Sequence, residues 1–124
     1  TGSKKTYVLH SSVDVEFEGL PLDVDDILVG DEVSLRMLSS KVREVTIRKR
    51  TTSDALGKVV SVTLDDGYYK MRLETSTTTQ TYWMIPDVVI EKDNKNKGPR
   101  DLKAGDRVVV SLAGDVITKV IVLN

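Results

Sequence analysis

The stretch DLKAGDRVVV, residues 101–110, repeats the frame of DILVGDEVSL, residues 26–35. Both read Asp, aliphatic, any, any, Gly, Asp, any, Val, and the two glycines lie 75 residues apart (105 − 30 = 75). The frame suits the start of a strand, because glycine tolerates the positive φ of a turn and the next aspartate bonds nearby backbone amides. We predict this structural role for Asp26, Gly30, Asp31 and Val33 and for Asp101, Gly105, Asp106 and Val108.

The likeness between the two ends of the chain extends beyond this frame. Residues 6–9 resemble residues 81–84, and residues 13–15 resemble residues 88–90, again at an offset of 75 residues. Residues 41–47 match residues 115–121 if one turn holds one extra residue. A repeat of this length suits a unit of about six short strands. The first copy lacks the segment that Gly57 to Glu74 provides in the second.

Apolar and polar residues alternate with period 2 along most of the chain, which is typical of half-buried strands. In the first copy the alternation predicts inward faces made by Val13, Val15 and Phe17, by Val33, Leu35 and Met37, and by Val45 and Ile47. In the second copy it predicts the inward sets Val60, Val62 and Leu64, and Tyr69, Met71 and Leu73, joined by a hairpin at Asp65-Asp66-Gly67.

Other local signals divide the second copy further. Pro86-Asp87 is expected to break a strand that precedes it, and residues 91–100 are expected to form an exposed loop. We therefore predict an all-β fold of two tandem small barrel-like units. The first is a partial copy over residues 1–50, a linker covers residues 51–56, and the second is a complete copy of about six strands over residues 57–124.

Composition limits the classes of function. The 124 residues are 40% hydrophobic and 30% charged, the balance of a soluble globular protein. The net charge of -1 removes the strong electrostatic case for nucleic acid as a partner. Without cysteine the chain has neither a disulfide nor a thiolate metal site. No apolar run approaches the roughly 20 residues of a spanning helix, so we expect no membrane insertion.

Few residues point to chemistry. His10 is the single histidine and no catalytic constellation is visible around it, so we predict that the chain is not an enzyme. Asp23, Asp25 and Asp26 form the densest acidic cluster, and clusters of carboxylates bind calcium. The spacing is not that of an EF-hand loop, and a solvated turn is the alternative interpretation. Calcium is the one cofactor that we consider.

Aromatic and basic residues define a second kind of candidate site. Tyr68, Tyr82 and Trp83 are candidate ligand-binding residues, because exposed aromatic rings stack on sugars or bases. Alternation sends Tyr82 and Trp83 to opposite faces, so core packing is the alternative. The basic residues between positions 41 and 50 could form a stripe that contacts phosphate or an acidic wall polymer, or a dispersed solvated face.

The second copy opens with GKVVSV at residue 57, passes an Asp-Gly hairpin and a tyrosine-containing strand, and ends in DLKAGDRVVV and VITKVIV. It resembles the tandem β modules of bacterial S-layer and S-layer-associated cell-surface proteins, well over residues 57–124 and partially over residues 4–49. The resemblance implies an extracellular, structural role at the bacterial cell surface. It also implies neighbouring domains or subunits of the same protein as partners, with a cell-wall polymer as a further candidate. No S-layer-homology wall anchor is visible in this segment.

Two questions stay open at this point. The alternative function is an OB-like binding module for a glycan or a single-stranded nucleic acid. The incomplete first copy also leaves an open strand edge, which invites pairing with another strand. We expect the natural protein to extend upstream of Thr1. Three arrangements would complete the first copy: upstream sequence supplies the missing strands, the two copies fuse into one sheet, or the edge pairs between molecules.

Overall fold

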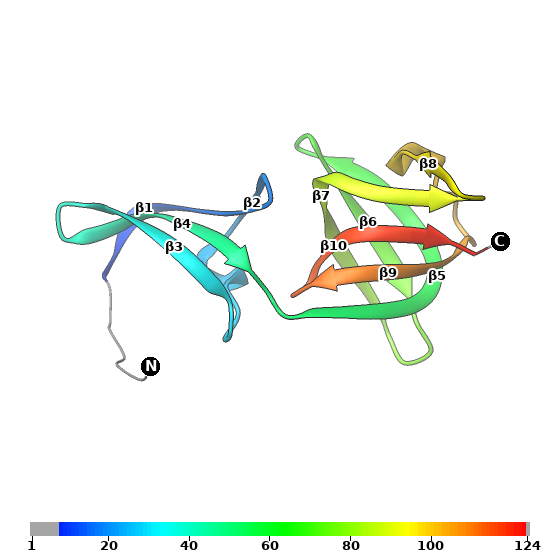
Figure 1. Ribbon diagram of the computed structural model, residues 1–124, viewed down its shortest axis with the longest axis horizontal. Helices are drawn as coiled ribbons and strands as arrows, with labels where there is room; N and C mark the ends of the chain where they lie inside the picture. Colours follow the sequence, from blue (N-terminus) through cyan, green and yellow to red (C-terminus); the bar gives the residue numbers. More distant parts are fainter. Residues whose placement is uncertain (1–7, 124) are drawn as a thin grey trace. The chain divides into compact units, whose positions relative to one another are not determined.

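The computed structural model describes residues 8–123, apart from the side chains of His10 and Ser11. Within this range the regular elements are ten strands and two short 3-10 turns, so the all-β prediction is confirmed (Figure 1). The described chain forms two compact units that divide between Arg50 and Thr51. Thr6 and Tyr7, which the sequence repeat includes, lie outside the described residues.

Unit 1, which ends at Arg50, is an open four-stranded sheet with the strand order β2-β1-β4-β3. Strands β1 and β4 are parallel, whereas β2 pairs with β1 and β3 pairs with β4 in antiparallel fashion. The sheet therefore does not close, and the structure does not show the barrel-like first unit that the sequence predicts. Its elements are β1 (Val8–Phe17), β2 (Leu20–Leu22), the 3-10 turn η1 (Val24–Asp26), β3 (Glu32–Leu38) and β4 (Lys41–Lys49).

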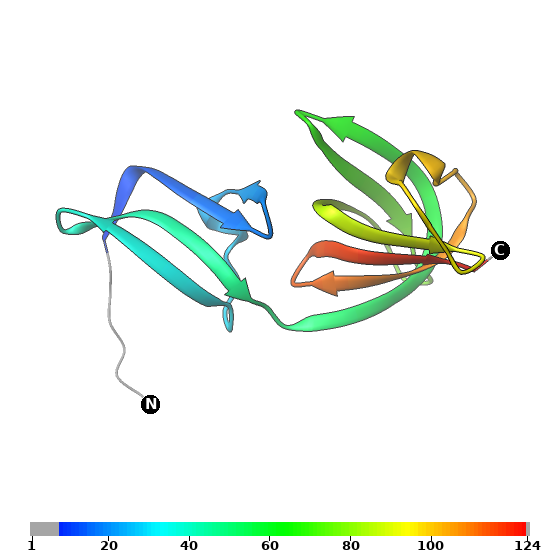
Figure 2. The same cartoon turned by 45° about the horizontal axis from the view of Figure 1, so that its top comes forward.

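Unit 2 is a six-stranded sheet with the order β10-β9-β5-β6-β7-β8. An additional parallel pairing of β10 with β7 closes five of the strands into a ring, which Figures 1 and 2 show from two directions. Strand β8 pairs with β7 outside that ring. The elements are β5 (Thr52–Asp65), β6 (Tyr68–Glu74), β7 (Thr79–Lys92), β8 (Lys95–Lys97), the 3-10 turn η2 (Pro99–Asp101), β9 (Arg107–Ala113) and β10 (Val116–Val122).

The pairings of unit 1 recur in unit 2 at the 75-residue offset. Val15 pairs with Val45 across β1 and β4, and Ile90 pairs with Val120 across β7 and β10. The same holds for the antiparallel pairs β3–β4 and β9–β10, and even for the interruption in the parallel pairing. Lys41 corresponds to Val116 by these registers, so the extra turn residue that the sequence alignment required is wrong.

Each unit has its own apolar interior. In unit 1 the buried hydrophobic side chains come from β1, β2 and β4: Val15, Phe17, Leu20, Val42, Val45 and Ile47. In unit 2 the core cluster joins residues from all five strands of the ring and Leu102, which follows η2. The predicted inward face of β3 is wrong, because Val33, Leu35 and Met37 are exposed although their strand forms as expected.

Three further expectations for unit 2 need correction. The predicted linker at residues 51–56 is wrong, because β5 begins at Thr52 and pairs with β9 from that residue onward. A register shift between Val59 and Ser61 turns Val59 inward and leaves Val60 and Leu64 exposed. Strand β7 continues through Pro86, which lies where the pairing with β10 is interrupted, so its missing N–H removes no ladder bond there.

The predicted exposed loop at residues 91–100 contains a hairpin. Asp93 and Asn94 both adopt positive φ, of 55° and 61°, and turn the chain from β7 into the short strand β8. Aspartate and asparagine tolerate this conformation better than other non-glycine residues. Residues 95–97 are exposed as expected, but they are part of the sheet.

Candidate functional site

The repeated aspartate and glycine motif builds the same turn in both units. The Asp26 carboxylate accepts a hydrogen bond from the Asp23 amide at 2.8 Å, and Asp101 accepts one from the Gly98 amide at 2.9 Å. Each bond closes one 3-10 turn on its own backbone. The carboxylates of the motif are thus engaged in shaping the chain.

The second half of the motif leads directly into a strand. Gly30 and Gly105 have φ of 96° and 92°, in the region that glycine favours. Asp31 accepts a hydrogen bond from the Leu28 amide and Asp106 accepts one from the Lys103 amide, each at 2.9 Å. The positive φ and the amide bonds are those expected of a turn that begins a strand, and Val33 and Val108 then lie in β3 and β9.

Unit 1 contains a buried ion pair that the sequence did not predict. The Nε atom of Arg50 lies 3.2 Å from Oδ1 of Asp31, and the two side chains are 0% and 3% exposed. Arg50 also donates to the Asp26 carbonyl at 2.7 Å, and its guanidinium lies 5.5 Å from the centre of the Phe17 ring. The arginine therefore joins the end of β4 to the motif turn and to β1.

Three of the basic residues at positions 41–50 make contacts within unit 1. Arg50 is buried as described, Arg43 donates to the Ser12 carbonyl, and Arg48 donates to the Ser34 hydroxyl at 2.9 Å. Each of these bonds joins strands of unit 1. Burial removes Arg50 from a polyanion stripe, and a stripe made by the exposed basic residues stays a prediction.

The acidic cluster is placed around the first 3-10 turn. Asp23 and Asp25 are exposed and Asp26 is half-buried. Among residues 8–123 no group of three or more His, Cys, Asp or Glu side chains is arranged to hold a metal ion. The bond from the Asp23 amide to Asp26 gives one of the three carboxylates a structural role. Calcium binding by this cluster stays a prediction.

The predicted ligand-binding aromatics fall on two faces of unit 2. Trp83 pairs with Lys70, whose Nζ lies 5.2 Å from the centre of the Trp83 ring, and Tyr68 shares this face because it lies two residues before Lys70 on β6. Tyr82 pairs with the buried Met71 and packs against the core. The structure therefore brings Tyr68 and Trp83 to one outer face and separates Tyr82 from them.

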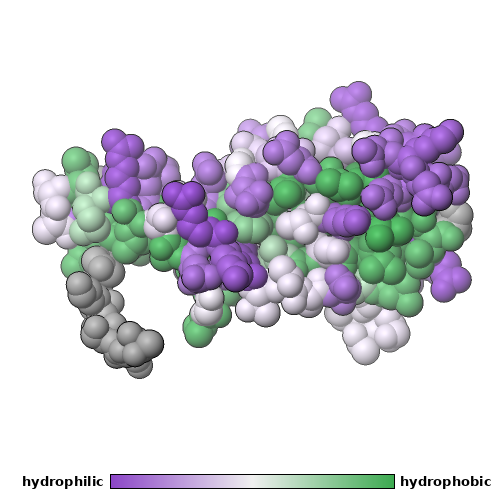
Figure 3. All heavy atoms as spheres, in the orientation of Figure 1, coloured by the Kyte–Doolittle hydropathy of each residue, from purple (hydrophilic) through white to green (hydrophobic). Residues whose placement is uncertain are grey.

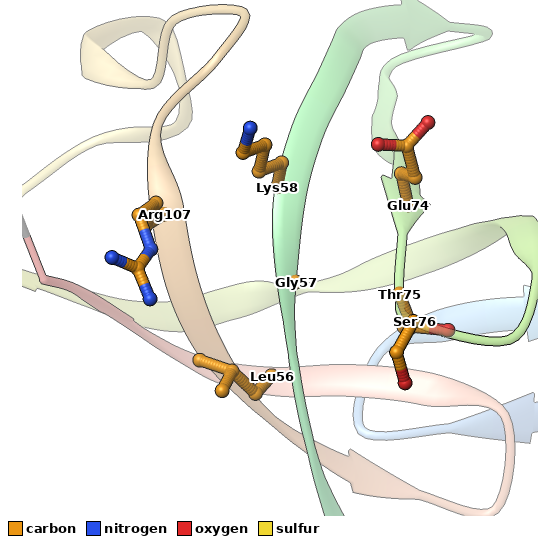
Figure 4. A pocket seen from close by; sticks show the side chains of 7 residues that line it. All are labelled: Leu56, Gly57, Lys58, Glu74, Thr75, Ser76 and Arg107. Carbon is orange, nitrogen blue, oxygen red and sulfur yellow. The ribbon is translucent and has the colours of Figure 1, made fainter.

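A shallow pocket lies where β5 passes between β9 and β6. Its volume is about 340 Å³, and Figure 4 shows the lining drawn from these strands and the turn after β6: Leu56, Gly57, Lys58, Glu74, Thr75, Ser76 and Arg107. Lys58, Glu74 and Arg107 place charges of both signs there. A Cβ atom at Gly57 would lie 2.4 Å from the Glu74 carbonyl oxygen, so the backbones meet at this point. The pocket marks a close strand crossing and shows no nucleophile beside a base.

Beside a smaller pocket lined by Tyr68 and Pro99, one arginine is held by an aromatic side chain. Arg100 donates from Nε to the Tyr69 hydroxyl at 3.0 Å, and this hydrogen bond raises the pKa of Arg100 above its ordinary value. The bond ties the segment after β8 to β6. Its role in this arrangement is structural.

Unit 1 carries an exposed apolar strand face. We define the β3 face as the exposed apolar side chains Val33, Leu35 and Met37, which alternate along β3. Leu9 on β1 is exposed as well. Figure 3 shows hydrophobic residues reaching the surface of both units in the view that it draws. An apolar strand face beside an open sheet edge is a typical site for contact with another strand.

Comparison with known proteins adds no assignment. No family model, curated protein or solved structure matches the chain. In the part of the chain that the structure describes, no helix has the length and apolar character needed to cross a membrane.

Proposed function

We propose that this chain is a non-enzymatic structural module of a bacterial cell-surface, S-layer-like protein. Its role is to build a scaffold or array through contacts with neighbouring repeats or subunits and with the cell wall. We take the complete form of the repeat to be a small barrel. The extracellular location follows from the resemblance of residues 57–124 to the β modules of S-layer proteins. The proposal takes the chain as one member of a larger set of similar units.

The observation that carries the proposal is the shared register of the two units. Val33 to Ile47 and Val108 to Val122 are equivalent pairs across β3–β4 and β9–β10, and the motif turns before them carry the same hydrogen bonds. The residues that recur are those that shape turns and strands. Repeat proteins stack such units so that each one contacts its neighbours, and this supports a structural role.

The alternative function is a binding module for a glycan or a single-stranded nucleic acid. One observation favours it: Tyr68 and Trp83 share an outer face with Lys70 between them. Aromatic rings beside a cation bind sugar rings or bases by stacking. However, the Lys70 ammonium also lies 3.0 Å from Asp65, which offsets its charge.

An amide NMR titration separates the two functions. The chain is titrated in turn with calcium, with an N-acetylglucosamine oligosaccharide and with a short single-stranded DNA. The structural proposal predicts no saturable shift at Tyr68, Lys70 or Trp83 with any of them. Saturable shifts at Tyr68, Lys70 and Trp83 that disappear in Trp83→Ala and persist in Trp83→Phe would replace it by the binding alternative.

A calcium response has its own signature. Saturable shifts confined to Asp23, Asp25 and Asp26 would show a metal-dependent surface module. Asp25→Asn is the informative variant. Asp26 is unsuitable, because its carboxylate accepts the hydrogen bond that closes the turn and replacing it would disturb the fold. Loss of the shifts in Asp25→Asn with unchanged signals elsewhere would assign the site.

A further inference from the structure

We propose that the open side of unit 1 is a docking site for a β-hairpin of the β5–β6 type, contributed by a neighbouring copy of the repeat. The inference rests on the proposed structural function and names the partner class for it. In unit 2 the hairpin β5–β6 lies between β9 and β7 and completes the ring. In unit 1 the counterparts of β9 and β7 are β3 and β1, and β3 is an edge of the sheet.

Equivalent side chains of β3 and β9 differ in their exposed fractions. The β3 face residues Val33, Leu35 and Met37 are 39%, 36% and 43% exposed. Their unit 2 counterparts, at the same positions of the same pairings, are 0%, 0% and 7% exposed: Val108, Val110 and Leu112. Side chains of the same class are therefore buried wherever the hairpin is present. The β3 face is a core surface without its cover.

Strand β1 shows the same contrast. Leu9 pairs with Val42 and is 41% exposed, whereas its counterpart Met84 pairs with Ile117 and is 1% exposed. Val8 is exposed too, and its counterpart Trp83 pairs with Lys70 of β6. The uncovered surface therefore includes both strands that a hairpin would bridge.

The backbone of the motif turn has bonding partners in unit 2 that define the docking register. The Val59 amide donates to the Asp106 carbonyl at 2.9 Å, and the Gly105 amide donates to the Val59 carbonyl at 2.7 Å. In unit 1 the corresponding groups are the Asp31 carbonyl and the Gly30 amide. A docked strand placed in this register pairs with β3 over Glu32–Leu38, as β5 pairs with Arg107–Ala113.

The chemistry of the occupant can be read from β5 and β6. It carries apolar side chains at the positions of Val59, Met71 and Leu73, which are buried in unit 2. It needs glycine at the position of Gly57, where a Cβ would lie 2.4 Å from a backbone oxygen of the partner strand. It also needs a tight turn such as that at Gly67, whose φ is 86°. These requirements specify a hairpin of this repeat.

Pairing of two copies of this chain through β3 satisfies fewer of the observations. Such a contact would extend the sheet at its edge and bond the free side of β3. It would not bridge β3 to the start of β1, so Leu9 and Val8 would stay uncovered. The hairpin is the occupant that covers both strands, and the second copy becomes an alternative outcome of the test.

The test uses the whole chain with an added hairpin. A copy of residues 52–78 is fused directly ahead of Lys4, because Lys4 is the counterpart of Thr79 at the 75-residue offset. The control fusion has the same length and carries Met71→Asp and Leu73→Asp within the added copy only. Amide hydrogen exchange of β3 and Leu9 is measured by NMR, and sedimentation gives the mass. Trp83 fluorescence reports unit 2 in every variant, since the added copy contains no tryptophan.

The proposal predicts that protection of the β3 amides rises by about a hundredfold or more in the fusion, which stays monomeric, and not in the control. Unchanged β3 exchange in a fusion with native unit 2 signals would overturn it. The proposal would also be overturned if the unfused chain formed a dimer with protected β3 amides and the added hairpin did not dissociate that dimer. Ligand binding at Trp83 would refute the proposed structural function and leave the hairpin result unaffected.

Discussion

The buried pair of Arg50 and Asp31 provides the sharpest prediction for stability. Arg50→Met removes the charge from a site where both side chains are almost fully buried and 3.2 Å apart. Asp31 is then left as a buried carboxylate without the arginine. Removing one partner of a buried pair costs about 3–5 kcal/mol, since the remaining charge has lost its compensation. The hydrogen bond to the Asp26 carbonyl is lost in the same variant.

This cost is large relative to the stability of unit 1. A unit of about 40 residues has roughly 2–6 kcal/mol of unfolding free energy. We therefore expect Arg50→Met to leave unit 1 largely unfolded at 25 °C while unit 2 keeps its own core. Asp31→Asn should have a similar effect, although an amide oxygen still accepts from the Leu28 amide. The double variant should lose less than the sum of the two single variants.

The assay reads the two units separately. Amide signals of Val45 and Ile47 report unit 1, and Trp83 fluorescence during urea unfolding reports unit 2. Arg48→Met is the matched control, because Arg48 is exposed and its loss should change the unfolding free energy by no more than about 0.5 kcal/mol. If unit 1 of Arg50→Met unfolded at the same urea concentration as the parent, the pair would contribute nothing and the reasoning would be refuted.

Three further predictions concern unit 2 and the repeat. Gly57→Ala should lower the unfolding free energy of unit 2 by about 1–3 kcal/mol, because the added Cβ meets the Glu74 backbone. Gly98→Ala is the control and should change it little, since the nearest atom to its Cβ lies 3.9 Å away. Equal urea midpoints for the two variants would contradict this. Leu112→Ala should cost about 2–5 kcal/mol and the equivalent Met37→Ala less than about 1 kcal/mol, as measured by urea unfolding of each unit. Trp83→Ala should leave oligosaccharide titrations as silent as those of the parent, and a parent response that this variant lacks would favour the binding function.

Local features of the fold were predictable because their causes lie within a few residues. Each carboxylate of the motif accepts from an amide three residues earlier, so the motif alone indicates the geometry: Asp26 from Asp23, Asp31 from Leu28 and Asp101 from Gly98. The hairpin at Gly67 follows from the same kind of signal. The separation of Tyr82 from Trp83 follows from alternation along one strand, and the pairing of β7 with β6 agrees with it.

Other features depend on residues far away in the sequence. The sequence groups Arg50 with the other basic residues as a stripe or a dispersed solvated face, because its buried partner Asp31 lies 19 residues earlier and cannot be seen locally. Alternation predicts Val60 inward because it assumes an uninterrupted pairing, and the shift between Val59 and Ser61 depends on how β6 fits against β5. Pro86 predicts a strand end, because one strand alone does not show the interruption of the β7–β10 pairing at which this proline lies.

By itself, the sequence determined the all-β class, the repeat and the turns that begin its strands, because alternation and turn chemistry are local properties of the chain. Only the tertiary structure decided which apolar faces are covered. Val33 and Val108 carry the same side chain in the same motif, and one is exposed while the other is buried. The difference is that unit 2 contains β5 and β6, for which unit 1 has no described counterpart. Burial depends on what packs on a strand as well as on the strand's own residues.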